Sequence, residues 1–282
     1  MKIILSMCNE GKKVLPCLES LNKFNTYIDI LHDGKVNKNT KKILLRFKTR
    51  IHEFPKIGCK EPHLTHFISK LGNNESILHV DYDEVITGKL FDEIKRMKFK
   101  TSFPIAVNMQ HESNKNDILY QDQASRSSKV IFFNTKNIQT IIGLPHKGIF
   151  FNSKPLFFRN IIKHNASHIN NSLLDHIRRD LHFSNLDALL RFFPIVIFSK
   201  QKLYMVGSNS RDIGYKDYLR FKYPILLYVP IIIFRVFQSF LWFFQVRNFS
   251  TFKYEFKIFI SRIIYQINLL NKIILYKYFS KN

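Results

Sequence analysis

The sequence is short of acidic residues: 21 Asp and Glu stand against 44 Lys and Arg, which gives a formal net charge of +23. So basic a chain favours an anionic partner, such as nucleic acid, a phosphorylated substrate or acidic lipid headgroups. A coding bias toward Lys, Asn and Ile would produce part of the same excess, so charge by itself does not choose among these partners.

Cysteine is also scarce. Cys8, Cys17 and Cys59 are odd in number and form no C-x-x-C pair. We therefore expect neither a disulfide framework nor a structural zinc site, and a reducing cytoplasm fits this composition. The first apolar run, residues 3–5, is followed at once by polar residues. It is too short for the hydrophobic part of a signal peptide, so we expect a β-strand there.

The chain has no apolar run that is both long and uninterrupted. Residues 223–234 and 236–246 are uncharged, but Arg235 separates them and Pro224 and Pro230 interrupt the first. A spanning helix needs about 20 apolar residues, and an Arg near its centre costs about 2.5–3.5 kcal/mol on insertion scales. The pattern favours a helix that lies in the membrane interface over one that crosses it.

Strand and helix patterns alternate over the first hundred residues. We expect strands at residues 3–6, 27–31, 50–54 and 77–80, with helices between them wherever apolar residues recur every three or four positions. This alternation predicts an α/β fold with a parallel sheet and right-handed crossovers. Further strands are expected at 104–110, 130–133 and 148–151, and a helix at 172–192.

Three polar or acidic positions directly follow predicted strands. Asn9 comes after the first strand, Asp33 after the second and Asp81 after the fourth. Because the carboxyl ends of parallel strands share one edge of a sheet, we expect the three to converge there. Ligands of open α/β sheets bind beyond that edge.

The run Asp81-Tyr82-Asp83-Glu84 carries the clearest chemistry in the sequence. Carboxylates spaced by one residue on a loop can hold Mg²⁺ or Mn²⁺, hard cations that usually also bind substrate phosphates. A departing pyrophosphate needs such a cation because negative charge builds on it. Acidic turns are common, however, and this one gains weight from the apolar strand before it and from Asp33 nearby.

Three segments resemble family 2 glycosyltransferases, and in particular small bacterial enzymes acting on lipopolysaccharide core or other surface glycans. The segments are I-I-L-S-M-C-N-E at residues 3–10, I-D-I-L-H-D-G at 28–34 and I-L-H-V-D-Y-D-E at 77–84. Residues 162–167 and 183–188 resemble that subgroup more loosely. The match is good to about residue 98, partial to about 192 and only compositional beyond.

The resemblance implies a GT-A fold, which is a Rossmann-like, mostly parallel sheet with flanking helices, and inverting sugar transfer from a nucleotide-sugar. By the same resemblance Asp33 would contact the nucleotide base or ribose, and Asn9 and Glu10 would line the nucleotide pocket. Asp81 would contact ribose and metal, and Asp83 would be the main metal ligand. Glu84 completes the D-x-D-E form. The implied cofactor is Mg²⁺ or Mn²⁺, and a UDP-sugar is the first-choice donor.

The sequence departs from the family at several points. Met7-Cys8 replaces the usual Pro or Thr, the second acidic turn has a single Asp33, and no clear acceptor-loop motif supplies the general base. An inverting enzyme needs one carboxylate near the acceptor hydroxyl. Asp122 is the first candidate and Glu112 the second, although a solvated loop acid is an equally plain interpretation of Asp122. His146 would lie at the rim of the site and Arg126 would contact phosphate, or both merely face water.

The composition changes at about residue 207. About half of the chain's aromatic residues follow this point, and basic residues far outnumber acidic ones there. An apolar stripe at helical spacing, with most of the basic residues off it, is typical of an interfacial anchor. Its members are Phe256, Phe259, Ile260, Ile263, Ile264, Ile267, Leu270 and Ile274. The alternative is a helix that packs this stripe on the catalytic domain.

These observations predict a catalytic domain at residues 1–206, with a nucleotide-binding half at 1–98 and an acceptor half at 99–206, followed by a membrane-associating helical region at 207–282. The expected enzyme is a hexosyltransferase-type glycosyltransferase. Its acceptor would be a lipid-linked or cell-surface glycan, and it would lie peripherally on the inner face of the cytoplasmic membrane.

Two other classes remain open. A nucleotidyltransferase would also use paired aspartates and a metal, but it usually carries a Gly-rich basic loop after its first strand, of which Asn9-Glu10-Gly11-Lys12-Lys13 is a poor version. A nucleic-acid-binding protein would explain charge and aromatic content. Against it, the tail is apolar in long runs rather than interleaved with Lys and Arg, so we expect no nucleic-acid partner.

Overall fold

The computed structural model describes residues 1–112, 128–144, 148–165, 172–192, 195–200, 202–206 and 249–279, with isolated residues between 219 and 237. Its internal contacts divide the chain into two units. The first unit is Met1–Ser167 with Phe198–Leu203, and the second is His168–Ile197 with Tyr204–Asn282. The helix expected at 172–192 therefore groups with the tail rather than with the sheet.

An eight-stranded sheet forms the first unit, in the order β3-β2-β1-β4-β7-β6-β10-β5. The neighbours β3, β2, β1 and β4 are parallel, as are β6 and β10, whereas β7 and β5 run antiparallel to their neighbours. The strands are β1 Lys2–Met7, β2 Ile28–Asp33, β3 Thr49–Phe54, β4 Ser76–Asp81, β5 Glu84–Ile86, β6 Ile105–Glu112, β7 Ser128–Asn134 and β10 Leu156–Asn165. The expected α/β class with a mostly parallel sheet is confirmed.

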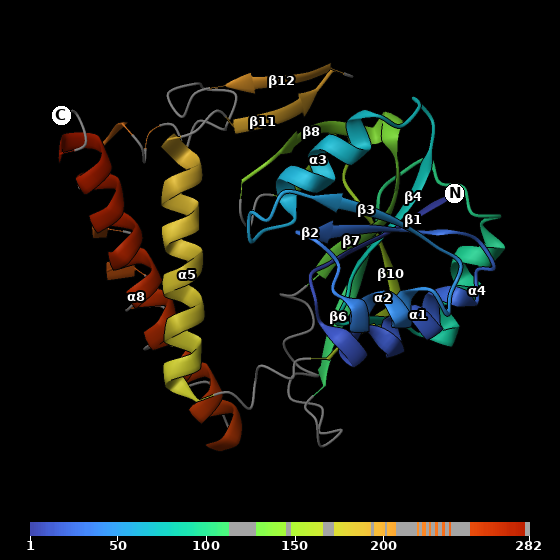
Figure 1. The fold of residues 1–282 in the computed structure, drawn as a ribbon, viewed down its shortest axis with the longest axis horizontal. Coiled ribbons are helices and arrows are strands. Elements are labelled where there is room, and N and C mark those ends of the chain that lie inside the picture. Colours follow the sequence, from blue (N-terminus) through green and yellow to red (C-terminus); the bar gives the residue numbers. More distant parts are fainter. Residues whose placement is uncertain are drawn as a thin grey trace. The chain divides into compact units, whose positions relative to one another are not determined.

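Helices cover both faces of this sheet (Figure 1). One face carries α1 Leu15–Asn22, α2 Lys38–Leu44 and α4 Gly88–Arg96, and the other carries α3 Glu61–Ser69. The short 3-10 helix η1, Gly11–Val14, joins β1 to α1. Successive residues of β1 point to opposite faces, so Ile3 and Leu5 join one cluster while Ile4 joins the other.

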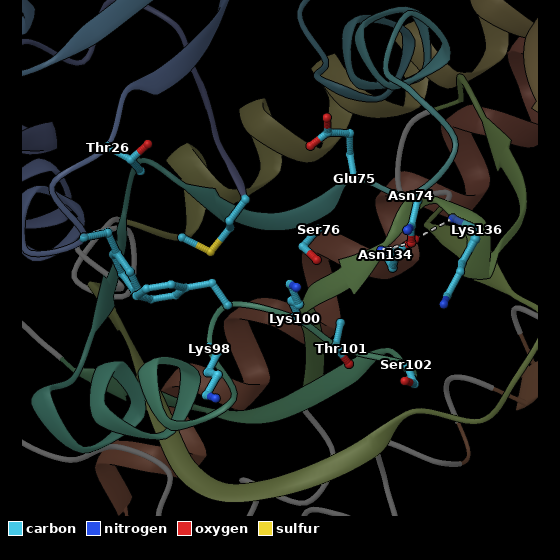
Figure 2. Close-up of a pocket in the computed structure, with 13 residues that line it drawn as sticks. Thr26, Asn74, Glu75, Ser76, Lys98, Lys100, Thr101, Ser102, Asn134 and Lys136 are labelled. Atoms are coloured by element: carbon cyan, nitrogen blue, oxygen red, sulfur yellow. Dashed lines mark hydrogen bonds between the residues drawn. The ribbon is translucent and has the colours of Figure 1, made fainter.

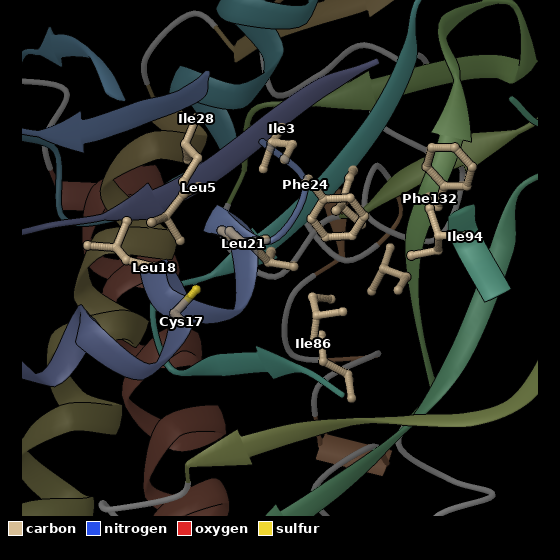
Figure 3. Packing of buried hydrophobic residues seen from close by; sticks show 14 of the residues in the cluster. Ile3, Leu5, Cys17, Leu18, Leu21, Phe24, Ile28, Ile86, Ile94 and Phe132 are labelled. Atoms are coloured by element: carbon tan, nitrogen blue, oxygen red, sulfur yellow. The ribbon is translucent and has the colours of Figure 1, made fainter. Parts of the chain in front are cut away.

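The larger cluster packs α1 and α4 against the central strands. Ile3, Leu5 and Ile28 of the sheet contact Leu18 and Leu21 of α1 within a fully buried core (Figure 3). Burying each such side chain stabilises the fold by about 1.5–3 kcal/mol. This packing fixes the carboxyl ends of β1, β2 and β4, on which the site is built.

The strands expected at 3–6, 27–31, 50–54 and 77–80 correspond to β1 to β4 within two residues at their ends. The segments at 104–110 and 130–133 correspond to β6 and β7. By contrast, β10 and β5 were not expected as strands. The pairing of β10 with β5 depends on contacts between residues far apart in sequence, which apolar periodicity does not reveal.

A second sheet has the order β12-β11-β8-β9, with β8 Ile138–Ile142, β9 Ile149–Phe151, β11 Ile195–Ser199 and β12 Lys202–Val206. The strand expected at 148–151 is β9, so it belongs here and not to the main sheet. A 3-10 helix, η3 Thr135–Asn137, leads from β7 into β8.

In the second unit, α5 Leu173–Phe192 packs on α8 Phe249–Phe279. Ala188 of α5 forms a small core with Leu269 and Ile273 of α8. Six leucine and isoleucine positions of α5 were expected to supply a core, but Leu174 and Leu189 are 53% and 41% exposed. Leu186, another of the six, is buried as expected, and the small Ala188 is buried in the contact with α8.

One member of the apolar stripe predicted on α8, Leu270, packs against the small core that Ala188 forms with Leu269 and Ile273. Leu269 and Ile273 are buried, whereas Phe256 and Ile267 of the stripe remain 48% and 44% exposed. Polar contacts support the helix pair, since the Asn268 amide donates to Ser184 Oγ at 2.7 Å and to Asn185 Oδ1 at 2.8 Å. Among the described residues, no helix is long and apolar enough to cross a membrane.

Candidate functional site

The parallel strands bring the predicted acidic residues to one edge of the sheet. Asp33 is the last residue of β2 and Asp81 the last of β4, and β1 lies between these two strands. In the strand register, Ser6 of β1 is opposite Asp81 and Met7 is opposite His32. Asn9 and Glu10 follow β1 directly, so the expected convergence on the carboxyl edge is present.

The carboxylate of Asp33 holds the loop that follows β3. Its Oδ1 accepts the Ile57 N–H at 2.7 Å and its Oδ2 accepts the Gly58 N–H at 2.8 Å. Gly58 has φ +90°, a conformation that glycine adopts without the strain a side chain would bring. His63 of α3 lies 2.9 Å from Asp33 Oδ1. Asp33 is therefore buried, with its oxygens facing protein donors.

Asn9 and Glu10 organise the loop after β1. The Asn9 amide donates to the Lys35 carbonyl at 3.1 Å and its Oδ1 accepts the Asn37 N–H at 2.9 Å, which ties this loop to the one after β2. Both carboxylate oxygens of Glu10 accept the Cys8 N–H, at 2.9 and 2.8 Å. Burial raises the pKa of Glu10, so this carboxylate is held in a partly desolvated position.

A cluster of paired charges surrounds Asp81. Lys129 of β7 donates to Asp81 Oδ2 at 3.0 Å and to Glu84 Oε1 and Oε2 at 2.8 and 2.6 Å. Lys60, which immediately precedes α3, also pairs with Asp81 Oδ2. Glu84 accepts the Asp81 N–H at 2.8 Å and is 1% exposed. Two ammonium groups thus neutralise two carboxylates inside the acidic turn.

The pKa values follow this pairing. Burial opposes charge on Asp81, but Lys129 and Lys60 outweigh it and hold the pKa of Asp81 well below its ordinary value. Burial likewise acts against the Lys129 ammonium, and Asp81 with Glu84 nevertheless raises the pKa of Lys129. At Glu84 burial dominates, so its pKa is raised despite Lys129. Both partners of the Asp81–Lys129 pair are therefore charged at neutral pH.

Asp83 faces a strand that is distant in sequence. Its Oδ2 lies 3.2 Å from Nε2 of His164 on β10. Burial tends to lower the pKa of His164, but the hydrogen bond to Asp83 prevails and raises it. The neighbouring Tyr82 has its pKa raised to about 12, mainly by burial and then by Asp83, so its hydroxyl remains a proton donor at neutral pH.

The donor atoms fit a divalent cation in part. Asp81 Oδ1 is buried and has no hydrogen-bond partner, and Asp83 lies two residues away on the same turn. Within the described ranges, no group of three or more His, Cys, Asp and Glu residues forms a metal cluster. Mg²⁺ is usually held by one or two carboxylates together with substrate phosphates. Asp81 and Asp83 would supply two such carboxylates, and substrate phosphates would supply further ligands.

Four of the predicted positions cannot be placed in this geometry. Asp122, Arg126 and His146 lie outside the described residues. Glu112 is the last residue of β6 and is paired in register with Asn165 of β10, but its side chain is outside the described set. The general base stays a prediction.

Sequence reasoning missed several residues of the site. Lys60, Lys129 and His63 follow no motif, and only tertiary folding brings them to the acidic residues. His164 lies in the segment 162–167, whose loose family resemblance was the one available signal. A basic residue directly after the third strand's loop could have drawn attention to Lys60, because that loop must end at the same sheet edge.

A separate cavity of about 610 Å³ lies at the opposite, amino-terminal edge of the sheet. Met1, Thr26 and Ser76, which begin or precede β1, β2 and β4, line it with the exposed side chains of Lys98 and Lys100 (Figure 2). None of the acidic residues of the D-x-D-E turn lines this cavity. It is therefore a different feature from the candidate site.

Comparisons with known proteins gave structural similarities alone. No protein-family model and no curated protein sequence matches the chain. Residues 1–349 of S. aureus TarS are similar with a TM-score of 0.40 at 9% identity, covering 98% of this chain and 91% of that one. The same protein in complex with UDP gives a TM-score of 0.37 at 11% identity, with the same coverage of 98% and 91%.

A Bacillus anthracis structure described as a putative glucose-1-phosphate thymidylyltransferase in complex with a sucrose is similar over a smaller part. Its TM-score is 0.29 at 12% identity, and the alignment covers 39% of this chain and 55% of that chain. These values are too low to transfer chemistry, so the assignments below depend on this chain's own residues.

Proposed function

We propose that this protein is a glycosyltransferase that takes a sugar from a nucleotide-sugar donor bound at the carboxyl edge of β1, β2 and β4. The observation that carries the proposal is the buried Asp81 Oδ1 without a hydrogen-bond partner, beside Asp83 at the position where open α/β sheets bind nucleotides. A buried carboxylate oxygen left without a donor is costly unless a ligand supplies the missing partner.

In this proposal Asp83 and Asp81 hold Mg²⁺ or Mn²⁺, which would stabilise the negative charge that builds on the leaving nucleoside diphosphate. Asn9 and Glu10 line the nucleotide pocket. Asp33 acts indirectly, because its carboxylate holds the backbone of residues 57–58, which border that pocket in this proposal. The family resemblance adds inverting transfer, with Asp122 as first candidate base and Glu112 as second.

The proposed acceptor is a lipid-linked or cell-surface glycan. The basic, aromatic-rich region after residue 207 supports this choice, because it suits attachment to an anionic membrane surface. The half-exposed side chains of Phe256 and Ile267 on α8 provide apolar contacts of the kind that such attachment uses. The protein would then work peripherally on the cytoplasmic face of the membrane, and nucleic acid would not be a partner.

A thermal-shift screen of UDP, GDP, CDP, CMP and dTDP, each with and without Mn²⁺, tests the proposal. A ligand that binds only the native state raises the midpoint by mass action. UDP is tested first because the family resemblance gives a UDP-sugar as the first-choice donor. A shift for one nucleotide that requires Mn²⁺ supports the proposal and identifies the donor class, whereas no shift with any of the five counts against it.

Asp83→Ala should abolish the Mn²⁺-dependent nucleotide shift without changing the midpoint of the ligand-free protein by more than a few degrees. Asp92→Ala is the matched control, because Asp92 is an exposed aspartate of α4. A full Mn²⁺-dependent shift in Asp83→Ala would remove the metal assignment. Formation of a nucleotide-sugar from a nucleoside triphosphate and a sugar phosphate, with release of pyrophosphate, would instead favour the nucleotidyltransferase alternative.

A further inference from the structure

Two lysines contact Asp81, and they differ in how firmly they are held. Lys129 has three acceptor oxygens around its ammonium, one from Asp81 and two from Glu84, and 18% of its side chain is exposed. An ammonium has three protons to donate, so Lys129 is saturated. Lys60 has Asp81 Oδ2 as its ion-pair partner, and 36% of its side chain is exposed. Lys60 is therefore the lysine that can move.

The position of Lys60 depends on Asp33. The Ile57 and Gly58 amides bind the Asp33 carboxylate at 2.7 and 2.8 Å, and Lys60 follows two residues later at the start of α3. This loop connects the end of β3 to the ends of β2 and β4. The backbone near Lys60 is thus anchored, while its side chain extends along the edge where the nucleotide would bind.

The charges of the site call for an exchange when a ligand enters. Asp81, Asp83 and Glu84 carry three carboxylates, and Lys60 and Lys129 oppose two of them. A diphosphate that arrived without a cation would be repelled by the carboxylates of Asp81 and Asp83. A divalent cation on Asp81 Oδ1 and Asp83 would in turn be repelled by the Lys60 ammonium on Oδ2, the other oxygen of the same Asp81 carboxylate.

We propose that Lys60 is an exchangeable cation of this site: it pairs with Asp81 when the site is empty and transfers to the diphosphate of a bound nucleotide when a divalent cation binds Asp81 and Asp83. This inference rests on the proposed function and adds the residue that recognises the nucleoside diphosphate. Lys129 remains on Glu84 and Asp81 in both states and holds the acidic turn in place.

Lys60→Met tests both steps of the exchange, because it should change the affinities for Mn²⁺ and for UDP in opposite directions. Without nucleotide, Mn²⁺ should bind about tenfold more tightly than in the wild type, since removal of one competing charge is worth about one decade. With saturating Mn²⁺, UDP should bind roughly ten- to a hundredfold more weakly, since a charge-assisted hydrogen bond is lost. Electron paramagnetic resonance of free Mn²⁺ and isothermal titration calorimetry of UDP measure the two constants.

Lys70→Met is the matched control, because Lys70 is exposed at the other end of α3. It should change neither constant. Lys60→Arg should keep UDP affinity within about threefold, because the positive charge is retained. If Lys60→Met does not fold, Lys60→Arg provides the test in its place. Loss of UDP affinity in Lys60→Arg would then contradict the proposal, because this variant keeps the positive charge.

The outcomes distinguish this inference from the function on which it rests. If the wild-type chain binds none of the five nucleotides in the presence of Mn²⁺, both the proposed function and the Lys60 exchange are contradicted. Wild-type binding with unchanged constants in Lys60→Met overturns the exchange and leaves the function standing. Loss of both Mn²⁺ and UDP affinity in Lys60→Met also overturns it, because that result would mean that Lys60 merely supports the fold of the acidic turn.

Discussion

At the scale of single residues, the acidic turn is held by an internal cation. Lys129 is bound on three sides by oxygens of Asp81 and Glu84. Glu84 is almost fully buried, and a buried carboxylate without a partner is strongly unfavourable. The Lys129 ammonium thus stabilises the folded acidic turn in the absence of any ligand.

Lys129→Met should lower the free energy of unfolding by about 3–5 kcal/mol, the typical result of leaving one partner of a buried pair uncompensated. Urea denaturation of the ligand-free protein measures this change. The double variant Lys129→Met with Glu84→Gln is the control, and it should recover part of the loss because the stranded charge is also removed. A loss below about 1 kcal/mol in the single variant would contradict the structural role of Lys129.

At the scale of elements, β4 carries a buried histidine two residues before the D-x-D-E turn begins. His79 is 5% exposed, and its Nε2 lies 3.2 Å from Ser6 Oγ on β1. Burial, aided by Lys129, holds the pKa of His79 well below its ordinary value. The folded protein therefore keeps this imidazole neutral at a pH at which the unfolded chain would protonate it.

This depressed pKa predicts a loss of stability in acid. The unfolded histidine has a pKa near 6.5, so the unfolded state binds more protons as pH falls below about 6.5. From His79 alone, stability should fall by up to about 1.4 kcal/mol per pH unit in that range. His79→Gln, which keeps a polar group beside Ser6, should show a shallower loss between pH 7 and pH 5 in urea denaturation. Equal slopes for the two proteins would refute this assignment.

At the scale of the whole molecule, acidic and basic residues are unevenly distributed along the chain. The chain carries a formal net charge of +23, yet the candidate site gathers acidic residues at one edge of the sheet. The region after residue 207 combines positive charge with aromatic and aliphatic residues. In the proposed function, the basic region after residue 207 is the part of the chain that would bind an anionic surface.

Charge reversal of Lys253, Lys257 and Lys272 to Glu should weaken binding to phosphatidylserine vesicles roughly a hundredfold or more, since each lysine near an anionic surface contributes about 1 kcal/mol. Co-sedimentation at low salt measures this change. Reversal of Lys38, Lys41 and Lys42, exposed on or beside the turns of α2, alters the net charge equally and should have little effect. Equal losses in both variants would mean that overall charge, and not the tail, drives attachment.

The sequence by itself determined the α/β class, the strands β1 to β4 and the convergence of Asn9, Asp33 and Asp81 on one edge. These follow from local apolar periodicity and from the rule that parallel strands share their carboxyl edge. It also singled out the D-x-D-E turn, because a motif on consecutive residues is visible without a fold.

Tertiary structure alone decided which partners the acidic residues have. Lys129 reaches Asp81 across 48 residues of sequence and Lys60 reaches it across 21, while His164 meets Asp83 through the pairing of β10 with β5. It also placed Leu269 and Ile273, which are not part of the predicted stripe of α8, beside Ala188 of α5, where Leu270 of the stripe packs as well. Long-range pairing and the choice of helix face depend on how whole elements pack together, which no local pattern encodes.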